Sequence, residues 1–258
     1  MRCLLFLTVF TTTLYSCNGL PEQKGRFANI SKADTTCLKE VSKAKADVQM
    51  GKLTFCHFAG SLLFEPLRSG DEMDSLLGKF GIGYAEEMTS DVIFEGQTQG
   101  CYCDFMKEQI DDKFGNDFID SLLNLSDSLY VQNNINDTFY YASCDTRPNY
   151  PSDTDMHPDE HSAVFQSDLD KSISYPVGYI KRPNYDSSAF VDVHLYVDKQ
   201  GNAVITGYRF LFDIKANYEH EKYFEQQIEK AMRKTGWTPA TIRNQKVNSD
   251  MVMRLGFD

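Results

Sequence analysis

Long apolar runs and an excess of basic residues are missing from this sequence. The apolar stretch near its start covers only residues 4–10, whereas a membrane-spanning helix needs about 20 apolar residues. The 258-residue chain has 26 Lys and Arg against 37 Asp and Glu, a formal net charge of -11. Because that charge repels phosphate, nucleic acid is not an expected partner. With 41% hydrophobic residues, the chain is expected to fold into globular domains.

Complete catalytic motifs are also missing. Gly81-x-Gly83 has no third glycine and no following Lys-Ser/Thr, so it completes neither a dinucleotide turn nor a phosphate loop. We expect a glycine-rich bend at this position instead. No G-x-S-x-G elbow occurs, and no histidine is spaced to serve as the base of a nucleophile. We therefore predict a protein that is not an enzyme and that has no cofactor or metal.

The N-terminus has the pattern of a secretory signal. One arginine, the apolar stretch and then small and polar residues precede Leu14-Tyr15-Ser16-Cys17, which resembles a bacterial lipobox. We predict a signal peptide over 1–16 and lipidation, including palmitate, at Cys17; plain signal cleavage or an unmodified thiol at Cys17 is the alternative. Residues 17–35 are polar and contain Gly and Pro, so a flexible tether is expected. Lipid chains would hold the protein on the bacterial envelope, on the periplasm-facing side of the outer membrane.

Five cysteines follow the lipobox, at Cys37, Cys56, Cys101, Cys103 and Cys144. Because five is odd, at least one must stay free or pair outside the chain in an oxidising compartment. The sequence favours buried thiols or a partial disulfide framework. A metal or redox site that uses Cys101 and Cys103, with Cys56 or His57, is the alternative, although a lone C-x-C is a weak signal.

The N-terminal half, 36–140, is predicted to be a small α+β domain of unknown family. A strand is indicated at 53–59 and another at 90–96, and Ser69 and Glu72 have the spacing of a capping box that would start a short helix ending at Gly78 or Gly81. Two more helices are indicated by apolar faces at Met106, Ile110 and Phe114 and at Phe118, Ile119, Leu122 and Leu123. The boundary is set near residue 140, where helical period is lost.

In the C-terminal half, 141–258, apolar residues recur with a clearer periodicity. Alternating residues predict a strand with Val191, Val193, Leu195 and Val197 on one face, a returning strand at 203–212 and a last strand with Met251, Met253, Leu255 and Phe257 on one face. Two helices are expected, one starting at Pro158-Asp159-Glu160 with Val164, Phe165 and Leu169 buried, and one capped by Asn217 and terminated by Gly236.

The only tryptophan, Trp237, follows the second of these helices. Pro239 prevents the helix from resuming, and Trp237 can pack across the helix end and the sheet. We therefore expect Trp237 and Pro239 to be structural anchors rather than ligand-binding residues.

The order of these signals resembles the C-terminal domain of TonB, in the form common in exported proteins of the Bacteroidetes. The resemblance covers about 145–258 and rests on Tyr175-Pro176, the Val-x-Val-x-Leu-x-Val-Asp strand, the Gly201 hairpin, Ala231-Met232, Trp237-x-Pro239 and Val247. It implies an antiparallel sheet of about three strands with two helices. TonB itself grips outer-membrane receptors by adding a peptide strand to the sheet edge. By resemblance, the partner-strand residues here are Val247, Met251, Val252, Met253 and Leu255.

Two departures from TonB matter for function. The sequence has no N-terminal membrane-spanning run and no long Pro-rich spacer, so energy transduction is not expected. We expect a membrane-tethered lipoprotein that binds an outer-membrane or periplasmic protein or peptide by strand addition.

The alternatives are an exported enzyme, redox protein or metal-binding protein. Their site would lie in the N-terminal half, or at His157 and His161 with Asp155, Asp159 and Glu160. Pro158 spoils helical spacing of the two histidines, which favours a solvated helix start.

Overall fold

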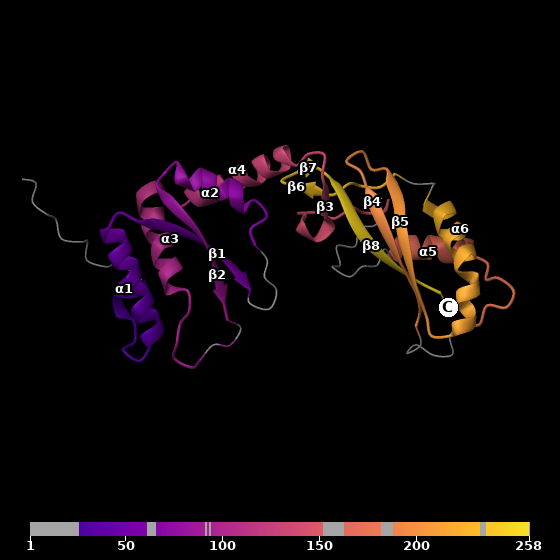
Figure 1. Cartoon of the computed structure of the whole chain (residues 1–258), viewed down its shortest axis with the longest axis horizontal. Coiled ribbons are helices and arrows are strands. Elements are labelled where there is room, and N and C mark those ends of the chain that lie inside the picture. Colours follow the sequence, from indigo (N-terminus) through magenta and orange to yellow (C-terminus); the bar gives the residue numbers. More distant parts are fainter. Residues whose placement is uncertain are drawn as a thin grey trace, which may run out of the picture.

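The computed structural model describes residues 26–60, 66–90, 92, 94–151, 163–181, 188–232 and 236–257. It is a mixed helix and sheet protein, as the sequence predicts, with an N-terminal unit (26–133) and a C-terminal unit (138–257) arranged along the longest axis (Figure 1). None of the helices in the described part of the chain has both the length and the apolar character needed to cross a membrane.

The N-terminal unit is built on a parallel pair of strands. β1 (Leu53–Gly60) pairs with β2 (Ile82–Thr89), and α2 (Gly70–Gly78) makes the crossover that a parallel pair requires. The other elements are η1 (Arg26–Asn29), α1 (Thr35–Gln49), α3 (Cys101–Phe114) and α4 (Phe118–Asn133). Core clusters join the strands to helices on both sides, and α4 extends toward the C-terminal unit (Figure 1).

The second strand of this unit lies where we expected a bend. Gly81 has a φ of 71° and ends the turn after α2, and the chain then continues directly into β2. The expected strand at 90–96 is not present in its described residues, where Val92 and Phe94 are 61% and 71% exposed. The two glycines favour a bend at 81–83, but Ile82 and Tyr84 beside Gly83 pack into the core, so the strand lies here instead of at 90–96.

The described end of the predicted tether is folded. Phe27 is buried against Phe105, with ring centroids 5.7 Å apart, and Arg26 pairs with Asp104 at 2.8 Å. The side chain of Asp34 caps α1 by accepting a hydrogen bond from the Cys37 amide at 3.1 Å. Residues 26–34 therefore belong to the N-terminal unit.

Two disulfides fasten the first turn of α3 to its neighbours. Cys37 of α1 bonds to Cys101, and Cys56 of β1 bonds to Cys103, while Cys144 carries a free thiol. The predicted partial disulfide framework with one unpaired cysteine is thus present. A two-stranded sheet offers little core of its own, so these crosslinks are a substantial part of what holds the unit together.

The C-terminal unit has a four-stranded sheet in the order β3-β8-β4-β5. β4 (Ala189–Val197) is antiparallel to both β5 (Ala203–Phe212) and β8 (Asn248–Gly256), which gives three antiparallel strands. The sequence prediction missed β3 (Thr138–Tyr140), a short strand parallel to β8. The remaining elements are η2 (Tyr141–Ser143), α5 (Ala163–Ser172), η3 (Lys215–His220), α6 (Glu221–Met232), β6 (Thr241–Ile242) and β7 (Gln245–Lys246).

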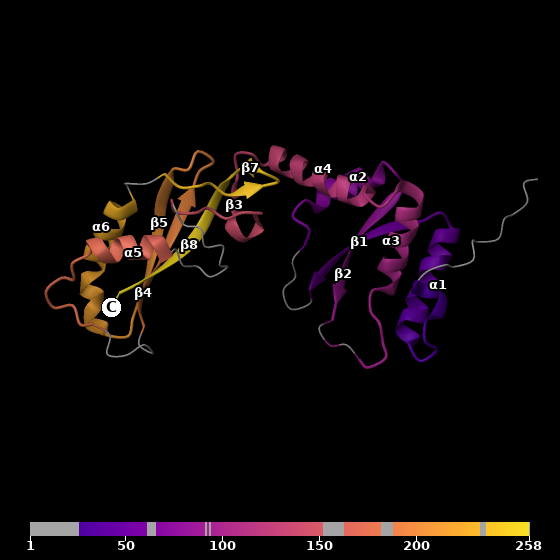
Figure 2. The same cartoon turned by 180° about the vertical axis from the view of Figure 1, so that it is seen from behind.

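One face of this sheet forms the main core. The predicted alternation is confirmed, because Val191, Val193, Leu195 and Val197 are all fully buried. They pack with Phe165 and Leu169 of α5 and with the α6 residues Phe224, Ile228 and Met232. Figure 2 shows α5 lying across the strands.

The two predicted helix starts have different outcomes. α2 begins and ends as predicted, with Ser69 at its N-cap position and Gly78 as its last residue, but the capping hydrogen bond is not formed. Ser69 precedes α2, but its hydroxyl bonds to Ser126 and Asp127 instead of an amide of the helix. Asn217 lies within η3, where its amide bonds to both the N–H and the C=O of Ile180, so α6 starts at Glu221. In each case a tertiary partner takes the side chain that local spacing assigned to the helix.

Candidate functional site

The outer edge of β8 is the main candidate site. β4 covers one side of β8 over 249–256, but β3 covers the other side only over 248–250. The Gln166 side chain bonds to both main-chain groups of Gly256, at 2.8 and 3.1 Å, and the Phe257 amide donates to Ala189 of β4. The main-chain N–H and C=O groups of successive residues point alternately to the two sides of a strand. The even-numbered residues of β8 therefore direct these groups away from β4. Val252 lies on this outward row, between β3 and Gln166.

The predicted partner-strand residues separate into three environments. Met251, Met253 and Leu255 are buried in the main core, and Val247 is buried in a smaller cluster with Val131 and Phe139. Val252 is half-buried on the opposite face of the sheet. Of the five side chains, only that of Val252 is accessible, so β8 could contact a partner chiefly through its main chain.

That opposite face is organised by a buried carboxylate that the sequence analysis did not single out. The Asp192 side chain is 3% exposed and accepts hydrogen bonds from Arg254 at 2.7 Å and Arg209 at 3.1 Å. Burial raises the pKa of Asp192, but the hydrogen bonds from Arg254 and Arg209 outweigh it and leave the pKa below its usual value. The three side chains join β5, β4 and β8 across the sheet.

Trp237 and Pro239 are both buried. The indole lies edge-on to Tyr150 at 5.6 Å, and the Trp237 amide donates to the Gly201 carbonyl at 2.9 Å. Gly201, in the β4–β5 hairpin, approaches so closely that an added Cβ would lie 2.2 Å from the Trp237 oxygen. Trp237 therefore ties the segment before β6 to this hairpin.

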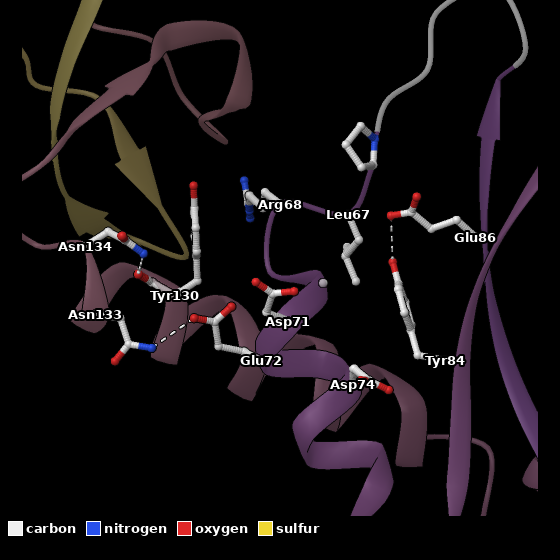
Figure 3. Close-up of a pocket in the computed structure, with 12 residues that line it drawn as sticks. Leu67, Arg68, Asp71, Glu72, Asp74, Tyr84, Glu86, Tyr130, Asn133 and Asn134 are labelled. Atoms are coloured by element: carbon white, nitrogen blue, oxygen red, sulfur yellow. Dashed lines mark hydrogen bonds between the residues drawn. The ribbon is translucent and has the colours of Figure 1, made fainter.

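A cavity of about 550 Å³ opens in the N-terminal unit at the start of α2 (Figure 3). Its acidic lining consists of Asp71, Glu72, Asp74 and Glu86. Tyr84 donates to Glu86 at 3.2 Å, and burial together with these acids raises the pKa of Tyr84 to about 12. The four carboxylates of this lining would attract cations.

A charged hub joins the two units. Asp127 of α4, which is buried, accepts from Arg68 at 2.8 Å, from Ser69 at 2.9 Å and from Arg243 at 2.8 Å. Arg68 also pairs with Asp145 at 2.8 Å. We call Arg68, Asp127, Asp145 and Arg243 the hub. Burial raises the pKa of Asp127, but hydrogen bonds from Arg68, Arg243 and Ser69 outweigh it and lower the pKa. The spacing of these residues along the chain gave no signal of the cluster.

The alternative cysteine site is not formed. Cys101 and Cys103 are bonded to separate partners, so they do not form a neighbouring dithiol. Over the described ranges, no group of three or more His, Cys, Asp or Glu is arranged to hold a metal ion. The predicted sites at Cys17 and at 155–161 lie outside the described residues.

Comparison of the chain with protein-family models, with curated proteins and with solved structures finds no match.

Proposed function

We propose that this chain is an exported bacterial envelope lipoprotein whose TonB-like C-terminal unit binds an extended segment of an outer-membrane or periplasmic protein. Binding occurs by strand addition at the outer edge of β8, without catalysis or energy transduction. The observation that carries the proposal is the partial occupation of this edge, by β3 at one end and by the amide of Gln166 at the other.

Both occupants mimic the bonds that an added strand would make. β3 bonds to β8 through its main chain, and Gln166 offers Gly256 an amide group like that of a peptide. A partner segment beside 251–255 would continue the row that β3 begins. Main-chain bonds would provide affinity with little dependence on side-chain identity.

β5, at the far edge of the same sheet, is less suited to accept a partner. The pairing of β4 with β5 shifts register between His194 and Leu195, whereas β8 pairs with β4 without a shift. Bulges disturb an edge and discourage pairing with another chain. The regular strand of this sheet is therefore the one proposed to receive the partner.

The disulfides support export. Cys37–Cys101 and Cys56–Cys103 require an oxidising compartment such as the bacterial periplasm. This agrees with the signal pattern and with a lipid anchor at Cys17, which would hold the protein on the envelope.

Photocrosslinking in cells tests the proposal. A photoreactive residue at Val252 should give a discrete adduct with an envelope protein, identified by mass spectrometry, and the same residue at the exposed Val204 of β5 should not. Gln166→Leu, which removes the amide from Gly256, should increase the Val252 adduct. Equal, diffuse labelling from both positions would refute strand addition at β8.

A further inference from the structure

β3 is too short to hold its place by pairing alone. Only Thr138, Phe139 and Tyr140 pair with β8, and they do so in parallel. Three residues supply few hydrogen bonds, and each bond made in the protein replaces one made with water. The position of β3 must therefore depend on the contacts that flank it.

The flanking contacts are an apolar cluster and the hub. Phe139 is buried with Val131, Ile242 and Val247, which connect α4, the β6–β7 hairpin and the start of β8. The hub brackets β3 along the chain, since Asp127 lies before the strand and Asp145 lies after it. Arg68 contacts both carboxylates and also donates to the Ser143 carbonyl at 2.8 Å.

The hairpin contributes the fourth member of the hub from a strained turn. Arg243 and Asn244 have φ values of 48° and 63°, which residues other than glycine rarely adopt. Such values suit a two-residue hairpin turn, where Asn-Gly and Asp-Gly are preferred. The Arg243 amide donates to Asp145 at 2.7 Å, and its guanidinium donates to Asp127. These two bonds hold an arginine where a glycine would fit with less strain.

We infer that the hub is a latch that keeps β3 on β8 and so sets how much of the β8 edge a partner can reach. The inference rests on the proposed strand addition. With the latch closed, β3 covers 248–250. With the latch open, β3 leaves and the receiving edge extends back to Asn248, so an incoming strand and β3 compete for the same main-chain groups.

Amide hydrogen exchange of single residues tests the latch. Asp250 is on the outward row and faces β3, whereas Ser249 faces β4 and serves as an internal control. Arg243→Gly removes the guanidinium and suits the positive φ, and Asp127→Asn removes the charge. Lys171→Ala breaks the exposed Lys171–Asp168 pair as a matched control.

Both hub variants should raise the exchange rate of the Asp250 amide by at least about tenfold and leave that of Ser249 unchanged, because removing one partner of a buried charge pair opens its surroundings locally. The Lys171 variant should change neither rate. An unchanged Asp250 rate in the folded hub variants would overturn the latch, as would an equal rise at Ser249. The Val252 crosslink reports separately on strand addition: if it is absent while the Asp250 rate rises, the proposed function fails and β3 is still held by the hub.

Discussion

Gly201 and Gly51 both adopt positive φ, at 88° and 75°, but their surroundings differ. A Cβ on Gly201 would lie 2.2 Å from the Trp237 oxygen, whereas a Cβ on Gly51 would meet nothing within 4 Å. Gly51→Ala should therefore cost only the backbone strain of roughly 1–2 kcal/mol, and Gly201→Ala at least about 3 kcal/mol. Urea unfolding measures both values. Equal losses would show that the hairpin can move away from Trp237.

The Asp192 carboxylate should make stability depend on pH. Its pKa in the folded protein lies below the value of about 3.9 for an unfolded chain, because the Arg254 and Arg209 hydrogen bonds outweigh burial. Its stabilisation is therefore present above about pH 4 and is lost as the pH falls through the folded pKa. Asp192→Asn should lower the free energy of unfolding by about 1.5–3 kcal/mol at pH 7, and by less near pH 3.

Asp120→Asn serves as the control for this experiment, because Asp120 is exposed on α4. It should change the free energy of unfolding little at either pH. A loss for Asp192→Asn that stays the same at pH 3 would contradict the electrostatic role of Asp192.

At the scale of elements, the disulfides should matter to one unit more than to the other. Replacing Cys56 and Cys103 together by alanine should destabilise the N-terminal unit by roughly 2–5 kcal/mol. The only tryptophan, Trp237, reports on the C-terminal unit. In this variant, the unfolding midpoint followed by Trp237 fluorescence should therefore fall less than the midpoint followed by the far-ultraviolet circular dichroism of the helices. Coincident shifts would mean that the two units unfold as one.

The elements that were best predicted from the sequence are those in which apolar residues recur regularly over many positions. β4 and β8 alternate over nine residues each, and α6 has a clear apolar face with Phe224, Ile228 and Met232 buried. β3 has only three residues and therefore no measurable period. β2 was missed because its glycine lowered the strand signal.

The hub could not be predicted by any local rule. Asp127 bonds to Arg68 across 59 positions of the chain and to Arg243 across 116. Neither partner lies at a spacing that a helix or strand would bring together. The same holds for Ser69, whose local spacing indicated a helix cap, whereas its hydroxyl bonds to α4. The β8 strand of the candidate site was predictable, but its two occupants were not.

The net charge of the whole molecule bears on how it is held at a membrane. A net charge of -11 is repelled by anionic lipid, so electrostatics alone would not hold this protein on a membrane. The lipid at Cys17 is therefore the proposed means of attachment.

Strand addition at β8 is tested by the in-cell photocrosslink from Val252 with Cys17 intact. We expect a discrete envelope-protein adduct from Val252, none from Val204, and a higher yield in the Arg243→Gly variant, whose β3 no longer covers the start of β8. Diffuse labelling that is the same from both positions, and unaffected by Arg243→Gly, would contradict strand addition at β8.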